Sequence, residues 1–179
     1  MLEVNYFVNF SQRAKRLSLK IEKTGKIVVT QPKKTPTHIV EKFLNENLSW
    51  IKSRLQKIKE AKHIEEPNLG LNSRQKHLLA AKKNITSKVI DWNKQLNFHY
   101  NKITIKNQSS RWGSCSTKKN LNFNYKLNLI DESLLDYVVI HELCHLQEMN
   151  HGPRFWNLVA SIMPDYKQRR SELKKIIID

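Results

Sequence analysis

The feature that most constrains the fold is the stretch VVIHELCHLQEMNHGPRFW, residues 138–156, which places three histidines and two glutamates within eleven positions. Its apolar spacing predicts a helix from about Glu132 to Met149, with Asp131 or Ser133 at its start. A row of apolar side chains lies on this helix opposite the first two histidines: Leu135, Val139, Leu143 and Leu146. Two further apolar residues lie on the histidine face itself. A helix that is apolar on two sides is buried, so we expect this one inside a core.

His141 and His145 are one helical turn apart, so both imidazoles can reach the same ion. On a buried helix they need partners, because an unpaired buried polar group is costly. Glu142 follows the first histidine, and in this arrangement it can hold a metal-bound water and take its proton. The sequence therefore predicts His141 and His145 as metal ligands and Glu142 as the catalytic base.

A third protein ligand must follow, because a catalytic zinc site has three protein ligands and one open position. His151 lies ten residues after His141, which is the spacing of the pattern H-E-x-x-H-x-x-G-x-x-H. Glu148 stands where that pattern has glycine. The alternatives are Glu148 itself, one turn beyond His145, and Glu172, which a last helix could bring back. We predict His151 and a single Zn²⁺ ion, although histidines also accept nickel, copper or iron.

The remaining sequence predicts an α+β fold, in which a small antiparallel or mixed sheet packs on helices. Strands are expected at residues 4–10, 16–23, 26–32, 102–106 and 121–129, and helices at about 35–58, 73–96 and 132–149. Thr24-Gly25 predicts a tight turn between the second and third strands. Residues 63–70 interrupt the helical pattern. We therefore expect an N-terminal part of strands plus a helix, residues 1–66, and a second part, residues 67–179, joined in one compact unit.

Charged residues are unevenly distributed along this chain of 179 residues, whose formal net charge is +16. Residues 71–119 hold 11 Lys or Arg against 1 Asp, whereas residues 120–153, which contain the histidines, hold 1 Lys against 5 Asp or Glu. A cation site needs local negative charge, and the acidic stretch supplies it. The basic remainder could attract nucleic acid, nucleotides or acidic proteins. It could equally be an ordinary lysine-rich surface in contact with solvent.

Targeting and cysteine patterns favour a cytoplasmic protein. The sequence has no run of eighteen apolar residues, so we expect no membrane-spanning helix and no membrane partner. Its first residues, MLEVNYFVNF, lack the basic start and apolar centre of a signal peptide. The two cysteines, Cys115 and Cys144, do not form a disulfide scaffold. The oligomeric state is left open.

Four segments closely resemble the YgjP-like zinc metallopeptidase family: RWGSCS at 111–116, LNFNYKL at 121–127, LDYVVIHELCHLQEMNHGPRFW at 135–156 and MPDY at 163–166. The stretches RAKRLSLKIEKTGKIVVTQP and FLNENLSWIKSRL look like the leading segment of the same family, so the resemblance covers nearly the whole chain. It implies a gluzincin-like or SprT-like arrangement of a small sheet, a zincin-like active-site helix and a cleft between them. Residues 67–179 would then be the zinc metallohydrolase core.

The resemblance also implies roles for individual residues. It assigns His141, His145 and His151 as zinc ligands and Glu142 as the catalytic acid and base, and it places the Arg111–Ser116 segment near the cleft. The implied reaction is hydrolysis of a peptide or an unfolded protein. A nucleotide pyrophosphatase activity has been ascribed within the family, so hydrolysis of nucleoside triphosphates is an alternative. A DNA-associated protease that uses the basic surface is a further alternative.

Four other residues are candidates for contacts with substrate or transition state. Arg111, Arg154 and Tyr166 could steady a developing oxyanion, and each could equally be a packed tyrosine or a surface arginine. The strand face that carries Asn122 and Asn124 could pair with an extended peptide at a sheet edge, or it could simply face solvent.

Overall fold

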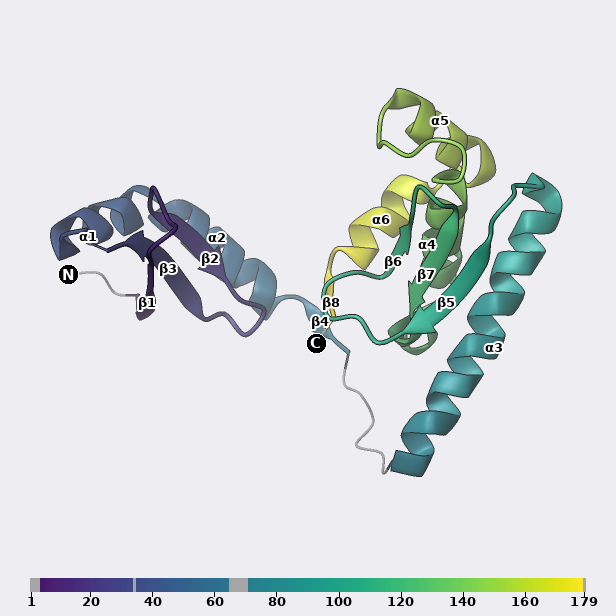
Figure 1. Ribbon diagram of the computed structural model, residues 1–179, viewed down its shortest axis with the longest axis horizontal. Helices are drawn as coiled ribbons and strands as arrows, with labels where there is room; N and C mark the ends of the chain where they lie inside the picture. The colour runs from purple at the N-terminus through teal and green to yellow at the C-terminus, as the bar shows by residue number, and fades with distance from the viewer. Residues whose placement is uncertain (1–3, 34, 65–70, 179) are drawn as a thin grey trace. The chain divides into compact units, whose positions relative to one another are not determined.

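The computed structural model describes residues 4–33, 35–64 and 71–178, and it divides the chain into two compact units, Met1–Ala61 and Lys62–Asp179 (Figure 1). Both units combine strands with helices, so the predicted α+β class is confirmed. The predicted boundary between residues 66 and 67 lies outside the described residues. No helix in the described part of the chain is both long and apolar enough to cross a membrane.

The first unit is a three-stranded sheet covered by two helices. The strands are β1 (Tyr6–Ser11), β2 (Ser18–Ile21) and β3 (Ile27–Pro32), in the order β1-β3-β2, with β1 parallel and β2 antiparallel to β3. The predicted turn between β2 and β3 is present, and Gly25 adopts a φ of 84° that favours glycine. Alternate residues of β3 are buried against the helices, as a half-covered strand requires.

The single helix predicted after Thr35 is wrong, because the structure contains two helices. These are α1 (Thr37–Glu46) and α2 (Leu48–Lys59), which are separated at Asn47. Asn47 has φ −103° and ψ 9°, and its side-chain amide donates to the carbonyl of Phe43 over 2.8 Å. Asparagine bonds to nearby backbone in this way, so it favours helix ends over helix interiors. The apolar spacing of the sequence continues across Asn47, so it does not predict this break.

In its described residues, the second unit contains a three-stranded sheet, four α-helices, a 3₁₀ helix and a short strand pair. Its elements are α3 (Leu71–Leu96), β5 (Lys102–Lys106), β6 (Gly113–Cys115), β7 (Asn120–Asn124), α4 (Glu132–Cys144), α5 (Pro153–Ile162) and α6 (Tyr166–Leu173), while β4 (Lys62–His63) pairs in parallel with β8 (Ile176–Ile177). The sheet order is β5-β7-β6, with β5 parallel and β6 antiparallel to β7. In Figure 1, α3 runs along β5, while α4 contacts β6.

The strand predicted at residues 121–129 is shorter than expected. β7 ends at Asn124, and Tyr125–Leu129 forms a 3₁₀ helix that begins where the Asn124 side chain accepts a hydrogen bond from the Lys126 amide. The pairing of Asn122 and Asn124 with a peptide at a sheet edge also needs correction. β7 is the central strand, so both of its edges are occupied, and the free edges of this sheet belong to β5 and β6.

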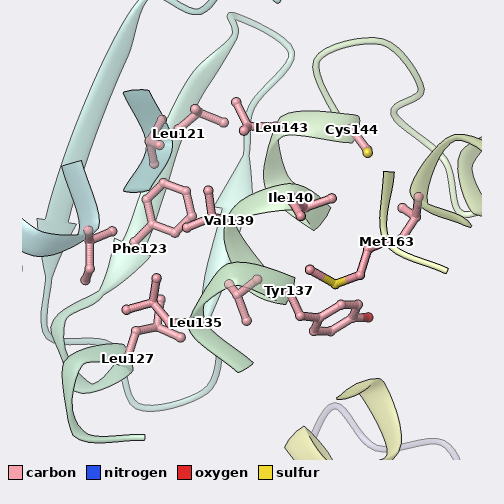
Figure 2. Packing of buried hydrophobic residues seen from close by; sticks show 14 of the residues in the cluster. Leu121, Phe123, Leu127, Leu135, Tyr137, Val139, Ile140, Leu143, Cys144 and Met163 are labelled. Carbon is pink, nitrogen blue, oxygen red and sulfur yellow. The ribbon is translucent and has the colours of Figure 1, made fainter. Parts of the chain in front are cut away.

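Helix α4 is buried on two sides, as its sequence predicts (Figure 2). One side packs against β7, where Val139 lies next to Phe123. On the other side, Tyr137 and Ile140 face Met163. These contacts hold the helix that carries the histidines between the sheet and the C-terminal segment.

The end of α4 differs from the prediction, because the helix stops at Cys144 and not at Met149. The amides of Leu146 and Gln147 bond to carbonyls three residues back, which tightens the chain and ends the α-helical pattern. The His145 amide still bonds to the His141 carbonyl over 3.3 Å. The two histidines therefore keep the one-turn spacing that the motif requires.

Candidate metal centre

Three histidine side chains converge at the C-terminal end of α4. The Nε2 atom of His151 lies 2.9 Å from Nε2 of His141 and 3.1 Å from Nε2 of His145. One ligand atom from each of the three lies within 4.8 Å of the others. Neither of the alternative ligands, Glu148 and Glu172, belongs to this group. The structure thus brings together the two helical histidines and the one that follows the turn.

The orientation of His145 is fixed by its second ring nitrogen. Its Nδ1 atom lies 3.0 Å from the carbonyl oxygen of Glu148. A carbonyl only accepts, so Nδ1 carries the hydrogen and Nε2 turns a lone pair toward the other histidines. The ring also stacks on Phe155, with centroids 4.5 Å apart. This backbone acceptor and the aromatic wall hold the ring as outer partners hold a metal-binding histidine.

The surroundings of the three imidazoles favour the neutral form that metal binding needs. Burial, then the charges of His145 and His151, lower the pKa of His141 to about 3. Burial also lowers the pKa of His145 and His151, and the Arg170 guanidinium adds to the effect on His151. Neutral histidines present lone pairs without first losing a proton.

The donor set fits a metal ion better than it fits hydrogen bonding alone. His151 Nε2 approaches two other ring nitrogens, but one N–H has a single hydrogen and can satisfy only one of them well. Zn–N bonds of about 2.0–2.1 Å in a tetrahedral site would place the nitrogens roughly 3.3 Å apart, close to the observed spacing. Three imidazole nitrogens are also a ligand set that zinc accepts.

Glu142 lies under the edge strand β6 and is only 5% exposed. The fit is so close that a Cβ added to Gly113 would lie 2.7 Å from its Cγ and Oε1 atoms. Burial raises the pKa of Glu142 to about 8, while the Arg111 charge and a hydrogen bond with the Cys115 backbone oppose that rise. Oε2 is buried and has no hydrogen-bond partner among the described residues. The carboxylate is therefore held by β6 on one side, with one oxygen uncommitted.

An aromatic stack extends from His151. The rings of His151 and Trp156 are stacked with centroids 5.4 Å apart, and Trp156 stacks in turn on Tyr166 at 5.5 Å. Trp156 Nε1 donates to the His151 carbonyl over 3.0 Å. The Arg170 guanidinium lies 4.4 Å from the centre of the Trp156 ring. These contacts support His151, which follows the end of α4 and has no helix of its own.

The other predicted contact residues lie in different surroundings. Arg111 is exposed and its charge acts on Glu142. Tyr166 is buried in the aromatic stack. Arg154 is exposed on α5. Gly113 and Arg170 were not singled out from the sequence: Gly113 lies inside the family-like RWGSCS segment, whereas nothing in the local pattern of α6 marks Arg170.

Asn124 is fully buried, so its side chain is not available to a substrate in this structure. Its amide nitrogen donates to the carbonyls of Gln108 over 2.7 Å and of Arg111 over 3.2 Å. The side chain thus ties the 107–112 loop to β7, just before the strand that covers Glu142. Its role is in positioning that loop.

We expect Asn124→Ala to lower the free energy of unfolding by about 1–3 kcal/mol, because it removes a fully buried side chain that donates to two carbonyls of the loop. Chemical denaturation of the wild type and the variant measures this. Asn122→Ala is the matched control, since Asn122 is half-buried and donates only one long bond, 3.5 Å, to Ser114. Equal losses for the two variants would contradict the special role of Asn124.

Comparison with known proteins identifies the family of the chain. The profile of the YgjP-like metallopeptidase domain matches residues 15–80 and 74–176. A search of curated proteins finds no match. Similar solved structures are the metallopeptidase zymogens of Pyrococcus abyssi abylysin, at 19% identity, and Methanocaldococcus jannaschii jannalysin, at 29%. Each likeness covers 50% of this chain, and 90% or 92% of the other, with a TM-score of 0.45. Because the family profile matches most of its length, the chain belongs to the YgjP-like metallopeptidase family and is a zinc metallohydrolase.

Proposed function

We propose that the chain is a peptidase in which His141, His145 and His151 hold one zinc ion and Glu142 moves the proton. The observation that carries the proposal is the convergence of three imidazole nitrogens next to a buried carboxylate. A structural zinc site would explain the histidines but would leave the buried charge of Glu142 without a purpose, since burying an unpaired carboxylate is costly. Membership of a metallopeptidase family supports peptides as the substrate class.

The zinc ion and Glu142 would have different roles in the reaction. Zinc, when bound, lowers the pKa of a coordinated water to roughly 7 and polarises a carbonyl. Glu142 accepts the proton of the attacking water and later delivers it to the leaving amine. Oε2 is the oxygen available for this transfer, because it has no other partner among the described residues. Burial raises the pKa of Glu142 to about 8, which suits a group that takes up and returns a proton near neutral pH, and the Arg111 charge limits that rise.

A place for the substrate backbone is suggested by the free edge of β6. This strand lies at the edge of its sheet, and its Gly113 approaches Glu142 directly. An extended peptide that adds to this edge would pass beside the carboxylate. We therefore still propose that a peptide pairs with a sheet edge, but at β6 and not at β7, which carries Asn122 and Asn124.

The two alternatives from the sequence have less support. Association with DNA rests on the basic composition, and hydrolysis of nucleoside triphosphates rests on that composition together with the resemblance. The description of the matching family names a metallopeptidase domain. The two alternatives remain predictions that one product analysis can separate from the peptidase reaction.

We expect the zinc-loaded protein to cleave an unfolded protein, to lose that activity with a strong chelator and to regain it when zinc is restored. Mass spectrometry of an incubation with an unfolded protein and nucleoside triphosphates identifies the products. Peptide fragments that vanish on chelation support the proposal. Monophosphate and pyrophosphate without any peptide fragment would contradict it and favour the nucleotide alternative.

A further inference from the structure

A pocket of about 340 Å³ adjoins the aromatic stack that extends from His151 through Trp156 to Tyr166. It is lined by two aromatic residues and by four residues of α6 and its C-terminal end: Trp156, Tyr166, Lys167, Arg170, Ser171 and Lys174. The volume is at the lower end of the range for small-molecule sites. It can therefore take a side chain or a chain terminus.

The basic residues of the pocket form one row. Lys167, Arg170 and Lys174 are three and four residues apart, which places them on the same face of a helix. All three are exposed, and in the part of the chain that the structure describes none of them forms an ion pair. The acidic neighbours are engaged elsewhere: Asp165 accepts from Arg169, and Glu172 accepts from Gln168. Three positive charges thus face the pocket without an acidic partner.

The middle cation of the row is held close to the metal centre. Arg170 lies over the face of Trp156, a contact that orients the guanidinium. The same ring stacks on His151 and donates to its carbonyl. A single aromatic ring therefore lies between the guanidinium and a proposed metal ligand. A group bound by Arg170 would therefore lie on the His151 side of the metal centre.

We propose that this pocket binds a carboxylate of the peptide substrate, so that the enzyme selects peptides with an acidic group near the cleaved bond. This inference rests on the proposed peptidase function. A guanidinium pairs with a carboxylate through two parallel hydrogen bonds, and the flanking lysines add charge of the same sign. The carboxylate belongs either to an Asp or Glu side chain or to the C-terminus of the peptide.

Binding tests this inference without relying on turnover. Zinc-loaded Glu142→Gln protein is titrated with three versions of a short peptide: neutral with an amidated end, neutral with a free C-terminal carboxylate, and amidated with one Asp moved along the sequence. We expect about tenfold tighter binding of at least one carboxylate-bearing version than of the neutral one, as for other charge-assisted pairs. Whether the Asp or the free terminus gives the gain identifies the source. Equal affinity for all versions would overturn the proposal.

Substitutions of pocket residues test whether the tighter binding of carboxylate-bearing peptides arises in this pocket. In the Glu142→Gln background, Arg170→Gln is expected to remove the preference, and Lys174→Gln to reduce it without disturbing the contact with Trp156. Lys83→Gln, which removes the same charge from an exposed position on α3, should keep it. A preference that survives both pocket substitutions would overturn the inference.

Cleavage by the otherwise wild-type enzyme separates the two proposals. Equal cleavage of neutral and acidic peptides would leave the peptidase function standing and contradict the carboxylate pocket. Selective binding of acidic peptides without cleavage of any version would support the pocket and contradict the peptidase.

Discussion

Replacing Glu142 with Gln should reduce the turnover of peptides by about 10²–10⁴-fold, the range that a positioned acid or base contributes. The amide has nearly the same size as the carboxylate, so the close contact with Gly113 is kept. The amide side chain cannot, however, accept the proton of the attacking water. Zinc content should remain one ion per chain, because none of the three converging histidine nitrogens is altered.

The stability of the same variant provides an independent check. Burial raises the pKa of Glu142 to about 8, so between its ordinary pKa and this value the folded protein must hold a proton that the unfolded chain releases, which costs stability. A neutral amide avoids much of that cost. We therefore expect the metal-free variant to unfold at the same temperature as the metal-free wild type, or at a higher one. A large loss of stability would indicate a structural role for Glu142.

Glu132→Gln is the matched control, because it makes the same substitution on the same helix. Glu132 is exposed at the start of α4 and pairs with Lys88. Losing an exposed ion pair costs at most about 1 kcal/mol, and the site is a full helix away. Steady-state kinetics should give wild-type turnover. If the two variants lost activity equally, the assignment of Glu142 as the base would be wrong.

The local part of the site could be predicted from the sequence because helical geometry fixes it. His141 and His145 lie one turn apart in any helix, and the apolar pattern around them required burial. The approach of His151 depended on how the chain turns after α4. Its spacing suggested the contact, but the early helix end at Cys144 and the packing of Trp156 could not be inferred from the motif.

The parts that the sequence did not predict depend on contacts between distant segments. Gly113 and Glu142 are 29 positions apart in the chain and meet because β6 lies along α4. Arg170 lies over Trp156, which belongs to another helix and stacks on His151. The central place of β7 is likewise a property of strand order. Periodicity describes one element at a time and does not contain this information.

Gly113→Ala tests the strand that covers the carboxylate, and we expect it to lower turnover by about 10²-fold, the effect of misplacing a catalytic group by roughly 1 Å. The new methyl group would lie 2.7 Å from Cγ and Oε1 of Glu142. Real Cβ atoms do not approach so closely, and Glu142 is the flexible partner, so its carboxylate must move. Metal content should not change, because the three atoms nearest the added Cβ all belong to Glu142.

Gly152→Ala separates this effect from a general intolerance of glycine substitution near the site. A Cβ at Gly152 meets nothing within 4 Å, and its φ of −78° suits any residue. We expect its unfolding free energy to change by no more than about 0.5 kcal/mol and its turnover to stay at the wild-type level. Steady-state kinetics and metal analysis of both variants decide the question. Full activity in Gly113→Ala would show that catalysis does not require the position of Glu142 under β6. Loss of activity in Gly113→Ala alone would show that the edge strand positions the base.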